Sequence, residues 1–567
     1  MLKFSEYVYE ELNIEEIEQE IRALIIKLKE AKKPREVYKN IDAITEVRIK
    51  VETNFSLGNV RFTLNTADEY YVKQMDFLDE ISPRYEALVN EFYQVLLESP
   101  FKEQIDKHYG PVLLKCAEVS LKAFDPKIMP ELIEDNKLKS RYSKLLAGAK
   151  IRFKGKTYNL SAMGKFLSDT DRRTRAAASK AYYKWFAENL SELDEIYDKM
   201  VHLRDTMAKK LGYKNYVELG YLRLGRVDYG PEEVKAYRDQ VYHDLVPFTK
   251  KLFRKQAKRL GIKGIKYYDY PLKFLSGNAR PIGDKDYLVN VAKKMYEEMS
   301  PETGEFFNFM LDCELLDLDT RPNKAGGGYT TTFPAYRAPF IFANFNGTSG
   351  DVDVLTHEAG HAFMAYQCRD FKLLETVWPT YEACEIHSMS MEFFAYPWTE
   401  GFFGEANDKY HFSHVEGEIT FIPYGVAVDE FQEYIYENPN ISPVERRAKW
   451  REIEKKYLPH LKYTGNEFLE NGGFWMRQRH IYESPFYYID YTIAQVLAFQ
   501  FFNLDRLNHQ DAWERYLALC NLGGSKSFLS LLKDRRVRLV SPFKKGCIKR
   551  VVKPLKEYLT QFDDSTM

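Results

Sequence analysis

Apolar residues that recur every three or four positions constrain the fold of this chain more than any other sequence feature. The first such segment, residues 13–33, would place on one face of an α-helix Ile14, Ile17, Ile21, Leu24, Ile25 and Leu28. Thr66–Glu69 has the polar side chains of a helix start. Residues 163–225 contain Ala-rich and charged stretches with few helix breakers. The pattern predicts a mainly α-helical protein.

Two segments interrupt the helical pattern in the first half of the chain. Short β-prone runs flank Gly155 within residues 151–160, as they do in a β-hairpin. Glycine and proline residues punctuate residues 257–285, where we expect loops and a crossing segment. We place a domain boundary at the hairpin, which gives an N-terminal helical domain, residues 1–150, and a second region, residues 151–567.

The sequence changes character again after residue 325. Gly326–Pro334 and Ala338–Gly347 are rich in aromatic, threonine and branched residues, and they predict two β-strands. Proline and glycine at the strand ends favour edge positions, where backbone N–H and C=O groups remain free to pair. We therefore expect the segment Phe340–Phe345 to offer a free edge to a bound chain.

The composition excludes several classes of function. The chain of 567 residues has 82 basic and 83 acidic side chains, so it lacks the positive excess that attracts nucleic acid. No stretch approaches the roughly 18 apolar residues of a membrane span, and we expect a cytoplasmic protein. The six cysteines show no CxxC spacing, which predicts reduced, mostly buried thiols and not a disulfide framework.

The clearest chemical motif is His357–Glu358–Ala359–Gly360–His361. Capping residues precede it, so we expect a helix near residues 351–367. Residues four apart are neighbours on a helix, and His357 and His361 can therefore present imidazole nitrogens to one Zn²⁺ while Glu358 lies beside it. Gly360 costs about 1 kcal/mol relative to alanine in a helix, and we infer close packing there.

A catalytic zinc usually has three protein ligands and one exchangeable water, so a third ligand must follow. We expect a helix near residues 380–395, and Glu375, before Pro379, in a loop. Spacing alone does not separate Glu382 from Glu385. A helix would place on one face Glu385, Ser388 and Glu392, which gives one ligand and two groups that orient ligands; an acidic, solvated helix face is the alternative.

These motifs resemble the oligoendopeptidase F and thimet oligopeptidase family of zinc peptidases. That family pairs His-Glu-x-Gly-His with a downstream Glu-x-x-Ser-x-x-x-Glu, matched here by residues 357–361 and by Glu385–Glu392. The resemblance selects Glu385 as the third ligand. It extends over about the last two thirds of the chain and includes residues 326–329 and 342–347, whereas the first 150 residues match only loosely.

The resemblance also implies a fold and further site residues. It implies a large helical shell around a substrate channel, with a small β-sheet next to the His-Glu-x-x-His helix. A His- and Tyr-rich segment faces the zinc in this family, and residues 480–491 are similar to it, although the tyrosine spacing departs from the thimet branch. We carry over as site residues His480, Tyr482, Tyr488 and Tyr491. In a chain with 41 tyrosines, core packing is the alternative for this cluster.

The predicted function is that of a metalloendopeptidase that uses one Zn²⁺ to cleave internal bonds of short peptides. Glu358 would act as general base and then general acid, and His480, Tyr488 and Tyr491 would donate hydrogen bonds to the oxyanion. Candidate substrate contacts are Gly327, Phe342, Ala343 and Asn344. An exopeptidase of the same metal class and a non-catalytic, zinc-containing peptide-binding protein are the alternatives. We expect a monomer or a small homo-oligomer.

Overall fold

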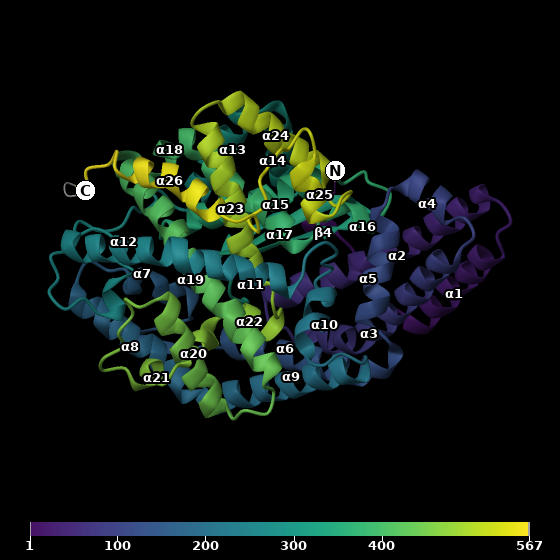
Figure 1. The fold of residues 1–567 in the computed structure, drawn as a ribbon, viewed down its shortest axis with the longest axis horizontal. Helices are drawn as coiled ribbons and strands as arrows, with labels where there is room; N and C mark the ends of the chain where they lie inside the picture. Colours follow the sequence, from purple (N-terminus) through teal and green to yellow (C-terminus); the bar gives the residue numbers. More distant parts are fainter. Residues whose placement is uncertain (1, 565–566) are drawn as a thin grey trace.

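The computed structural model describes residues 2–564 and 567, and most of them belong to α-helices (Figure 1). The chain begins with six helices: α1 (Ile14–Glu30), α2 (Pro34–Leu64), α3 (Glu69–Glu98), α4 (Lys102–Tyr109), α5 (Val112–Ala123) and α6 (Met129–Ala147). The predicted helix in residues 13–33 is α1. The predicted start near Thr66 is also confirmed, because the Asp68 side chain accepts hydrogen bonds from the first backbone N–H groups of α3.

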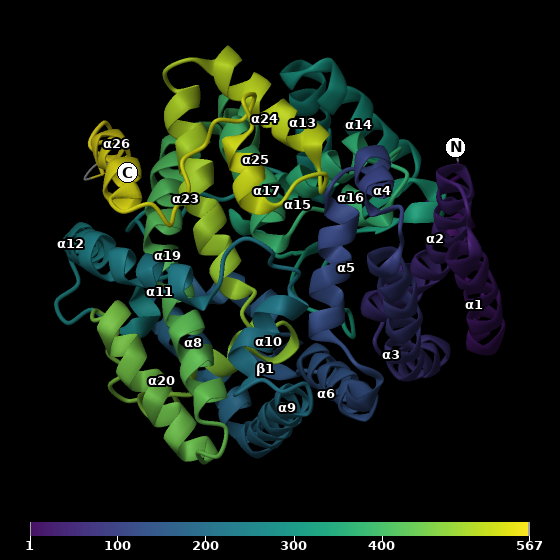
Figure 2. The same cartoon turned by 45° about the vertical axis from the view of Figure 1, so that its right-hand side comes forward.

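The N-terminal helices have a hydrophobic core of their own. Its buried residues come from α1 to α5, with Leu373 as one contribution from the rest of the chain. The end of α2 instead enters the main core through Leu57 and Val60. Figure 2 shows α5 and α6 between the N-terminal helices and the body, where they contact α10 (Tyr216–Arg223) and α9 (Leu190–Lys210). The exact domain boundary at residue 150 stays a prediction.

The predicted hairpin and the loops predicted in residues 257–285 are both present. Strands β1 (Ile151–Phe153) and β2 (Lys156–Tyr158) pair antiparallel across Lys154 and Gly155, which both have positive φ. Residues 260–284 are irregular apart from one short 3₁₀ turn. The helices of this part of the chain are α7 (Gly164–Leu167), α8 (Arg172–Glu188), α9, α10, α11 (Pro231–Gln240), α12 (Val246–Arg259), α13 (Lys285–Met299) and α14 (Pro301–Asp312).

A three-stranded sheet covers the next segment, in the order β3 (Leu316–Asp319), β5 (Ala338–Phe345), β4 (Tyr329–Phe333). The prediction that Phe340–Phe345 has a free edge is wrong, because β5 pairs with β3 on one side and with β4 on the other. Pro339 is tolerated because the β3 pairing begins only at Ile341. The two free edges of the sheet therefore belong to β3 and β4.

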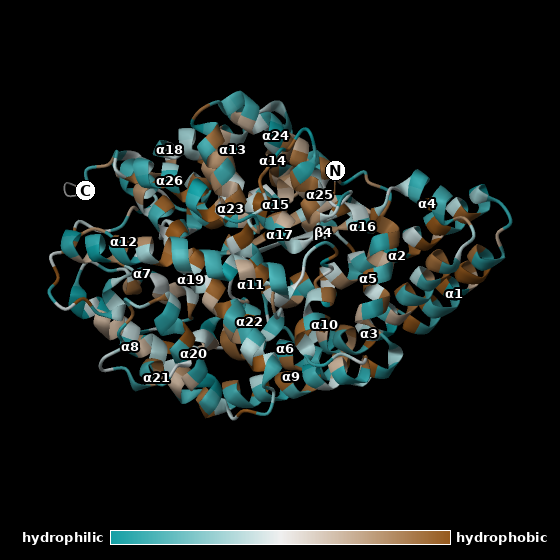
Figure 3. Cartoon of the chain, viewed as in Figure 1, coloured by the Kyte–Doolittle hydropathy of each residue, from teal (hydrophilic) through white to brown (hydrophobic). Residues whose placement is uncertain are grey.

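The centre of the molecule is built by α15 (Gly350–Gln367), α17 (Tyr381–Phe394) and α23 (Tyr488–Asp505). α17 packs on both of the others, and all three helices bury most of their residues. In Figure 3 the outer helices have hydrophilic outward faces, as α1 and α9 do. The remaining helices are α16 (Leu374–Val377), α18 (Glu400–Phe403), α19 (Asn407–Glu437), α20 (Pro443–Tyr457), α21 (Glu467–Glu470), α22 (Arg479–Glu483), α24 (His509–Leu522), α25 (Phe528–Lys533) and α26 (Cys547–Leu559).

α15 and α17 approach each other closely at Gly360. A Cβ atom built at this position would lie 2.6 Å from the carbonyl oxygen of His387 and 2.7 Å from the Cα of Ser388. Both are backbone atoms, so only a shift of one helix could relieve the clash. The close packing inferred from the sequence is confirmed.

We expect Gly360→Ala to lower the free energy of unfolding by about 1–3 kcal/mol, the usual cost of overpacking, despite the better helix propensity of alanine. Urea unfolding of metal-free protein, followed by circular dichroism, measures the change. Gly417→Ala in α19 is the matched control, because a Cβ there meets nothing within 4 Å; it should be neutral or stabilising by up to about 1 kcal/mol. Equal changes at both positions would contradict the packing argument.

Two other expectations concern the whole chain. All six cysteines are free, and five are buried while Cys116 is partly buried, as the scattered spacing predicted. Within residues 2–564 and 567, the structure has no helix with both the length and the apolar character that a membrane crossing requires.

Candidate functional site

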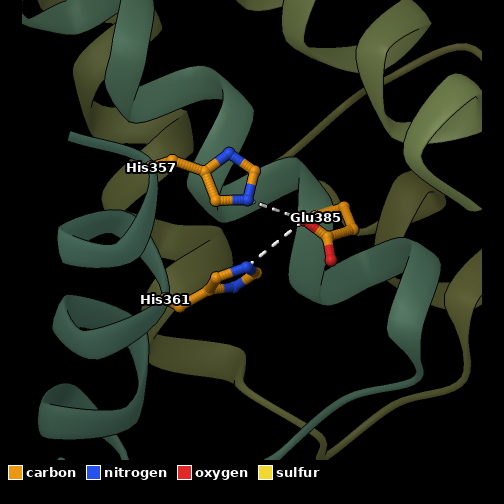
Figure 4. A group of neighbouring side chains, drawn as sticks. All are labelled: His357, His361 and Glu385. Carbon is orange, nitrogen blue, oxygen red and sulfur yellow. Dashed lines mark ion pairs between the residues drawn. The ribbon is translucent and has the colours of Figure 1, made fainter. Parts of the chain in front are cut away.

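His357, His361 and Glu385 converge on one point between α15 and α17 (Figure 4). The Oε2 atom of Glu385 lies 3.2 Å from Nε2 of His357 and 3.2 Å from Nε2 of His361. The histidines are one helical turn apart on α15, so both imidazoles leave the same face of the helix. Glu385 is almost fully buried and reaches the histidines from the first half of α17.

These three atoms fit the ligand set of a zinc ion. Bonds of about 2.0 Å from a tetrahedral Zn²⁺ to nitrogen and oxygen place neighbouring ligand atoms about 3.3 Å apart. The two distances from Glu385 to the histidines match that separation. Two imidazole nitrogens and one carboxylate oxygen are also the donors that a catalytic zinc takes, with a fourth position left for water.

Further hydrogen bonds hold two of these ligands in place. Nδ1 of His357 lies 2.7 Å from Oε1 of Glu392, whose other oxygen lies 2.7 Å from Nε2 of His414. The Ser388 hydroxyl donates to Oε2 of Glu385 at 2.9 Å. The shared face predicted for Glu385, Ser388 and Glu392 is therefore present, and such partners fix the orientation of a ligand. His414 in α19 was not anticipated, because nothing in the sequence links it to a site 22 residues earlier.

The charges of the site favour a deprotonated Glu385. Burial alone would raise the pKa of Glu385, but the adjacent His361 and His357 hold it well below its ordinary value. Burial alone would lower the pKa of His357, but hydrogen bonds to Glu385 and Glu392 raise it well above its ordinary value. A metal and a proton thus compete for the same imidazole nitrogen, and metal binding here must release protons.

Glu358 lies beside the three ligands and is buried. Its Oε2 atom accepts a hydrogen bond of 2.8 Å from the Thr330 hydroxyl of β4. A Cβ atom on Gly328 would lie 3.0 Å from Oε1 of Glu358, so the glycine leaves room for this carboxylate. Burial raises the pKa of Glu358, against the effect of His357 and His361. A carboxylate with a raised pKa is a stronger base, as proton transfer from water requires.

A cavity of about 650 Å³ opens onto these residues. One wall is formed by residues 326–331, which include the start of β4 with its free edge, and another by α15 and α17. A further part of the lining comes from residues 479–491. The predicted His- and Tyr-rich segment thus reaches the metal ligands from a position about one hundred residues further along the chain.

Tyr487 is the nearest tyrosine of this segment to the metal ligands, and it was missed by the sequence analysis. Its hydroxyl donates to Oε1 of Glu385. Tyr491 also lines the cavity, and its hydroxyl lies 3.0 Å from Nε2 of His480. Tyr488 packs against His480 with ring centroids 5.0 Å apart, but it is not among the residues that line the cavity. The spacing of four between Tyr487 and Tyr491 was the available signal.

Tyr487→Phe tests the contact with Glu385. Removal of the hydroxyl leaves one oxygen of Glu385 without its donor, and we expect metal affinity or kcat/KM to fall about 10- to 100-fold, as for other groups that support a ligand. Competition with a metal chelator and steady-state kinetics measure the two quantities. Tyr488→Phe is the matched control, because the hydroxyl of this neighbour makes no contact with the ligands, and unchanged values in both variants would contradict the assignment.

Tyr482 is a correction to the predicted site. It is fully buried and stacks on Tyr142 with ring centroids 4.0 Å apart, and it also contacts Tyr197 and Trp475. The short helix α22 turns this side chain into the aromatic core while its first residues face the cavity. Tyr482 therefore belongs to the aromatic core, which was the alternative to a role in the site.

The four predicted substrate contacts separate into two groups. Phe342 and Ala343 are fully buried in the central strand β5, so their side chains do not face the cavity. Gly327 lines the cavity in a left-handed conformation with φ of 87°. The Asn344 side chain donates to the carbonyl oxygens of Ala325 and Gly327 at 2.9 and 2.8 Å, and so fixes the path of the glycine-rich segment.

Glu375 also differs from its expected position. It lies in the one-turn helix α16 and not in a loop, and it lines the cavity. The buried Arg48 and Tyr93 of the N-terminal helices donate to its Oε1 atom at 2.5 and 2.6 Å. Glu375 therefore ties α16 to α2 and α3 and is not part of the group formed by His357, His361 and Glu385.

Two models of known protein families match this chain. The model of the peptidase family M3 N-terminal domain matches residues 4–124, and the model of peptidase family M3 matches residues 165–281 and 302–547. The chain belongs to peptidase family M3. It is therefore a metallopeptidase that acts on peptides, and the oligoendopeptidase F resemblance drawn from the motifs is confirmed.

Known relatives agree with this family. The structure superposes on a crystal structure assigned to oligoendopeptidase F with a TM-score of 0.99 and 47% sequence identity, over 100% of both chains. It superposes on PZ peptidase A, solved with an inhibitor, with a TM-score of 0.98 and 48% identity, over 99% of this chain and 100% of that one. The oligoendopeptidase F homolog of Borreliella burgdorferi is 22% identical over 95% of this chain and 94% of its own.

Proposed function

We propose that this family M3 peptidase is a zinc-dependent endopeptidase that cleaves internal bonds of short peptides. The observation that carries the proposal is the convergence of two imidazoles and one carboxylate at tetrahedral spacing. A second carboxylate, that of Glu358, lines the same cavity and is not one of the three ligands. A purely structural zinc site would be closed by four protein ligands and would not need Glu358. The cytoplasmic location and the oligomeric state expected from the sequence stay predictions.

Glu358 would move the proton in the reaction. A Zn²⁺ held by His357, His361 and Glu385 would polarise the scissile carbonyl and make water a stronger acid. Glu358 takes the proton of the attacking water and later delivers it to the departing amine. The hydrogen bond from Thr330 to its Oε2 atom keeps the carboxylate turned toward the ligands.

Tyr491 and His480 would stabilise the negative charge that develops on the carbonyl oxygen. Burial raises the pKa of Tyr491 well above its ordinary value, so its hydroxyl stays protonated and can donate. Burial and Arg479 lower the pKa of His480 to about 4, so this imidazole is neutral at pH 7. One well-placed donor to an oxyanion contributes about 3 kcal/mol to catalysis.

Substrate would bind in an extended conformation along the free edge of β4. Residues 329–331 of this strand line the cavity, and the edge has unpaired backbone groups on the side away from β5. Backbone pairing selects for an extended chain and tolerates many sequences. A cavity of about 650 Å³ admits a short extended peptide and is too small for a folded protein.

The proposal is tested with a mixed library of ten-residue peptides that are acetylated at the N-terminus and amidated at the C-terminus. Mass spectrometry maps the cuts before chelation, after chelation, and after addition of Zn²⁺ or Mg²⁺ to the chelated protein. We expect internal cuts that disappear on chelation and return with Zn²⁺ and not with Mg²⁺, because the ligand set contains two imidazoles.

Three results would count against the proposal in different ways. Cleavage of unblocked peptides alone would make the protein an exopeptidase. Cleavage that survives complete metal removal would exclude the metal mechanism. Digestion of native globular proteins at the rate of the peptides would contradict a site that admits only short extended chains.

A further inference from the structure

A second cavity, of about 170 Å³, adjoins the one that holds the metal ligands. Gly326, Gly327 and Arg479 line both cavities and form the partition between them. Arg479 donates a hydrogen bond to the carbonyl oxygen of Gly326 at this partition, and a peptide that lies along residues 326–331 would reach it. The larger and the smaller cavity are therefore neighbours, with shared lining residues on this side of the site.

The smaller cavity is lined by three basic residues, Lys324, Arg477 and Arg479, and by no acidic one among the described residues. Two of the three cations are already neutralised. Lys324 forms an ion pair of 2.6 Å with Asp317, and Arg479 forms one of 3.1 Å with Glu483. The positive charge that remains in the cavity is that of Arg477.

Arg477 has no carboxylate within ion-pair distance among residues 2–564 and 567. Its guanidinium carbon lies 4.0 Å from the centre of the Phe474 ring and 5.9 Å from that of Tyr424. The Arg477 side chain is exposed to solvent where it lines this cavity. Stacking on an aromatic ring fixes the guanidinium plane and leaves its N–H groups available to an anion.

A cation of this kind favours one type of ligand. No carboxylate of the described chain pairs with Arg477, so its guanidinium can pair with an anionic ligand that enters the cavity. Arginine forms two parallel hydrogen bonds to a carboxylate, and a carboxylate is the only anionic group that an unmodified peptide has. Gln478 connects this wall to the catalytic residues, since its amide nitrogen lies 2.7 Å from Nδ1 of His480 and its amide oxygen accepts from Tyr424 at 2.9 Å.

We propose that Arg477 binds a carboxylate group of the peptide substrate in the smaller cavity, which would set the distance between that carboxylate and the scissile bond. The inference rests on the proposed function, because it assigns a substrate contact to the same peptidase site. The carboxylate has two possible sources, the C-terminus of the peptide or an Asp or Glu side chain near it, and one experiment separates them.

The experiment uses three peptides of one sequence: the free acid, the C-terminal amide, and the amide with glutamate as the last residue. We expect wild-type kcat/KM for the free acid to exceed that for the simple amide by about 10-fold or more, mostly through KM, as for a charge-assisted bidentate pair. If the glutamate amide is cleaved as well as the free acid, the side chain is the source. If it is cleaved as slowly as the simple amide, the C-terminus is.

Arg477→Gln should remove this preference, bringing the ratio to within about twofold. Arg477→Lys keeps the charge without the planar fork and should give an intermediate ratio. This second variant keeps the test possible if the glutamine variant does not fold. Arg506→Gln is the matched control. Arg506 also stacks on aromatic rings, those of Phe502 and Tyr558, and lines neither cavity, so the wild-type ratio should persist.

Failure of this inference is distinct from failure of the proposed function. Equal wild-type rates for all three peptides, or an undiminished preference in both Arg477 variants, would overturn it while peptidase activity stands. Calorimetric titration of the same peptides into the Glu358→Gln protein gives the ratio of dissociation constants without turnover. A ratio that depends on Arg477 would support the carboxylate site even if no peptide were cut.

Discussion

Glu358→Gln is expected to lower kcat/KM by about 10³-fold or more while the protein retains its zinc. Glutamine has nearly the same shape as glutamate, so the Thr330 contact and the packing of α15 can persist. It cannot take a proton from water at neutral pH, and general acid–base catalysis by one residue contributes about 10²- to 10⁴-fold. Glu358 would act in both proton transfers, which places the expected loss at the upper end of that range.

Two measurements together test this prediction. Elemental analysis of the variant should find about one zinc per chain, as in the wild type, because the three ligands are unchanged. Steady-state kinetics on a blocked peptide should then show the loss in kcat and little change in KM, since substrate contacts remain. Near-normal turnover at full zinc content would exclude Glu358 from the reaction.

The second large effect is expected from Glu385→Gln, which should weaken zinc binding by at least about 10²-fold. The variant replaces a buried carboxylate that lies 3.2 Å from both histidine nitrogens. Loss of a group that merely supports a ligand already costs about 10- to 100-fold in metal affinity, and loss of a ligand should cost more. Competition with a chelator at buffered Zn²⁺ measures the affinity directly.

Glu382→Gln is the matched control for Glu385→Gln. Glu382 lies one turn earlier on the same helix and is equally buried, but its carboxylate accepts from Thr380 and does not contact the histidines. The sequence left these two residues as alternatives, and the structure places only Glu385 at the site. Similar losses of zinc in both variants would mean that burial of charge in α17, and not ligation, controls the affinity.

The helices and the metal ligands were the most predictable parts of this protein. A spacing of four on a helix puts His357 and His361 on one face whatever surrounds them, and the same rule placed Glu385, Ser388 and Glu392 together on α17. These relations are local, so one helix suffices to determine them. The choice between Glu382 and Glu385 needed the family resemblance, because it depends on how α17 lies against α15.

The orientation of the tyrosines was not predictable from periodicity. Phe486 has a positive φ of 66°, and Arg226 donates to its carbonyl oxygen at 2.7 Å. This left-handed residue immediately before Tyr487 determines how α23 begins, and therefore which tyrosines face Glu385. Such a conformation is rare for a large side chain and is imposed by tertiary contacts, which the sequence pattern does not contain.

The free edge was assigned to the wrong strand for a similar reason. Pro339 and Gly347 at the ends of β5 favoured an edge strand. β3 pairs in parallel with the second half of β5. Its four residues, Leu316–Asp319, alternate apolar and acidic in too short a run to be identified. Long-range pairing of a short strand is a property of the whole fold.

The five-residue length of β4, Tyr329–Phe333, has a consequence for peptides that have structure of their own. An edge this short engages about two or three residues of a partner through the main chain, and only if they are extended. A hormone-like peptide that is helical in solution would first have to unwind around its cleavage site, so its hydrolysis rate should follow its helix–coil equilibrium. N-methylation of alternate residues next to the scissile bond should protect an otherwise good substrate.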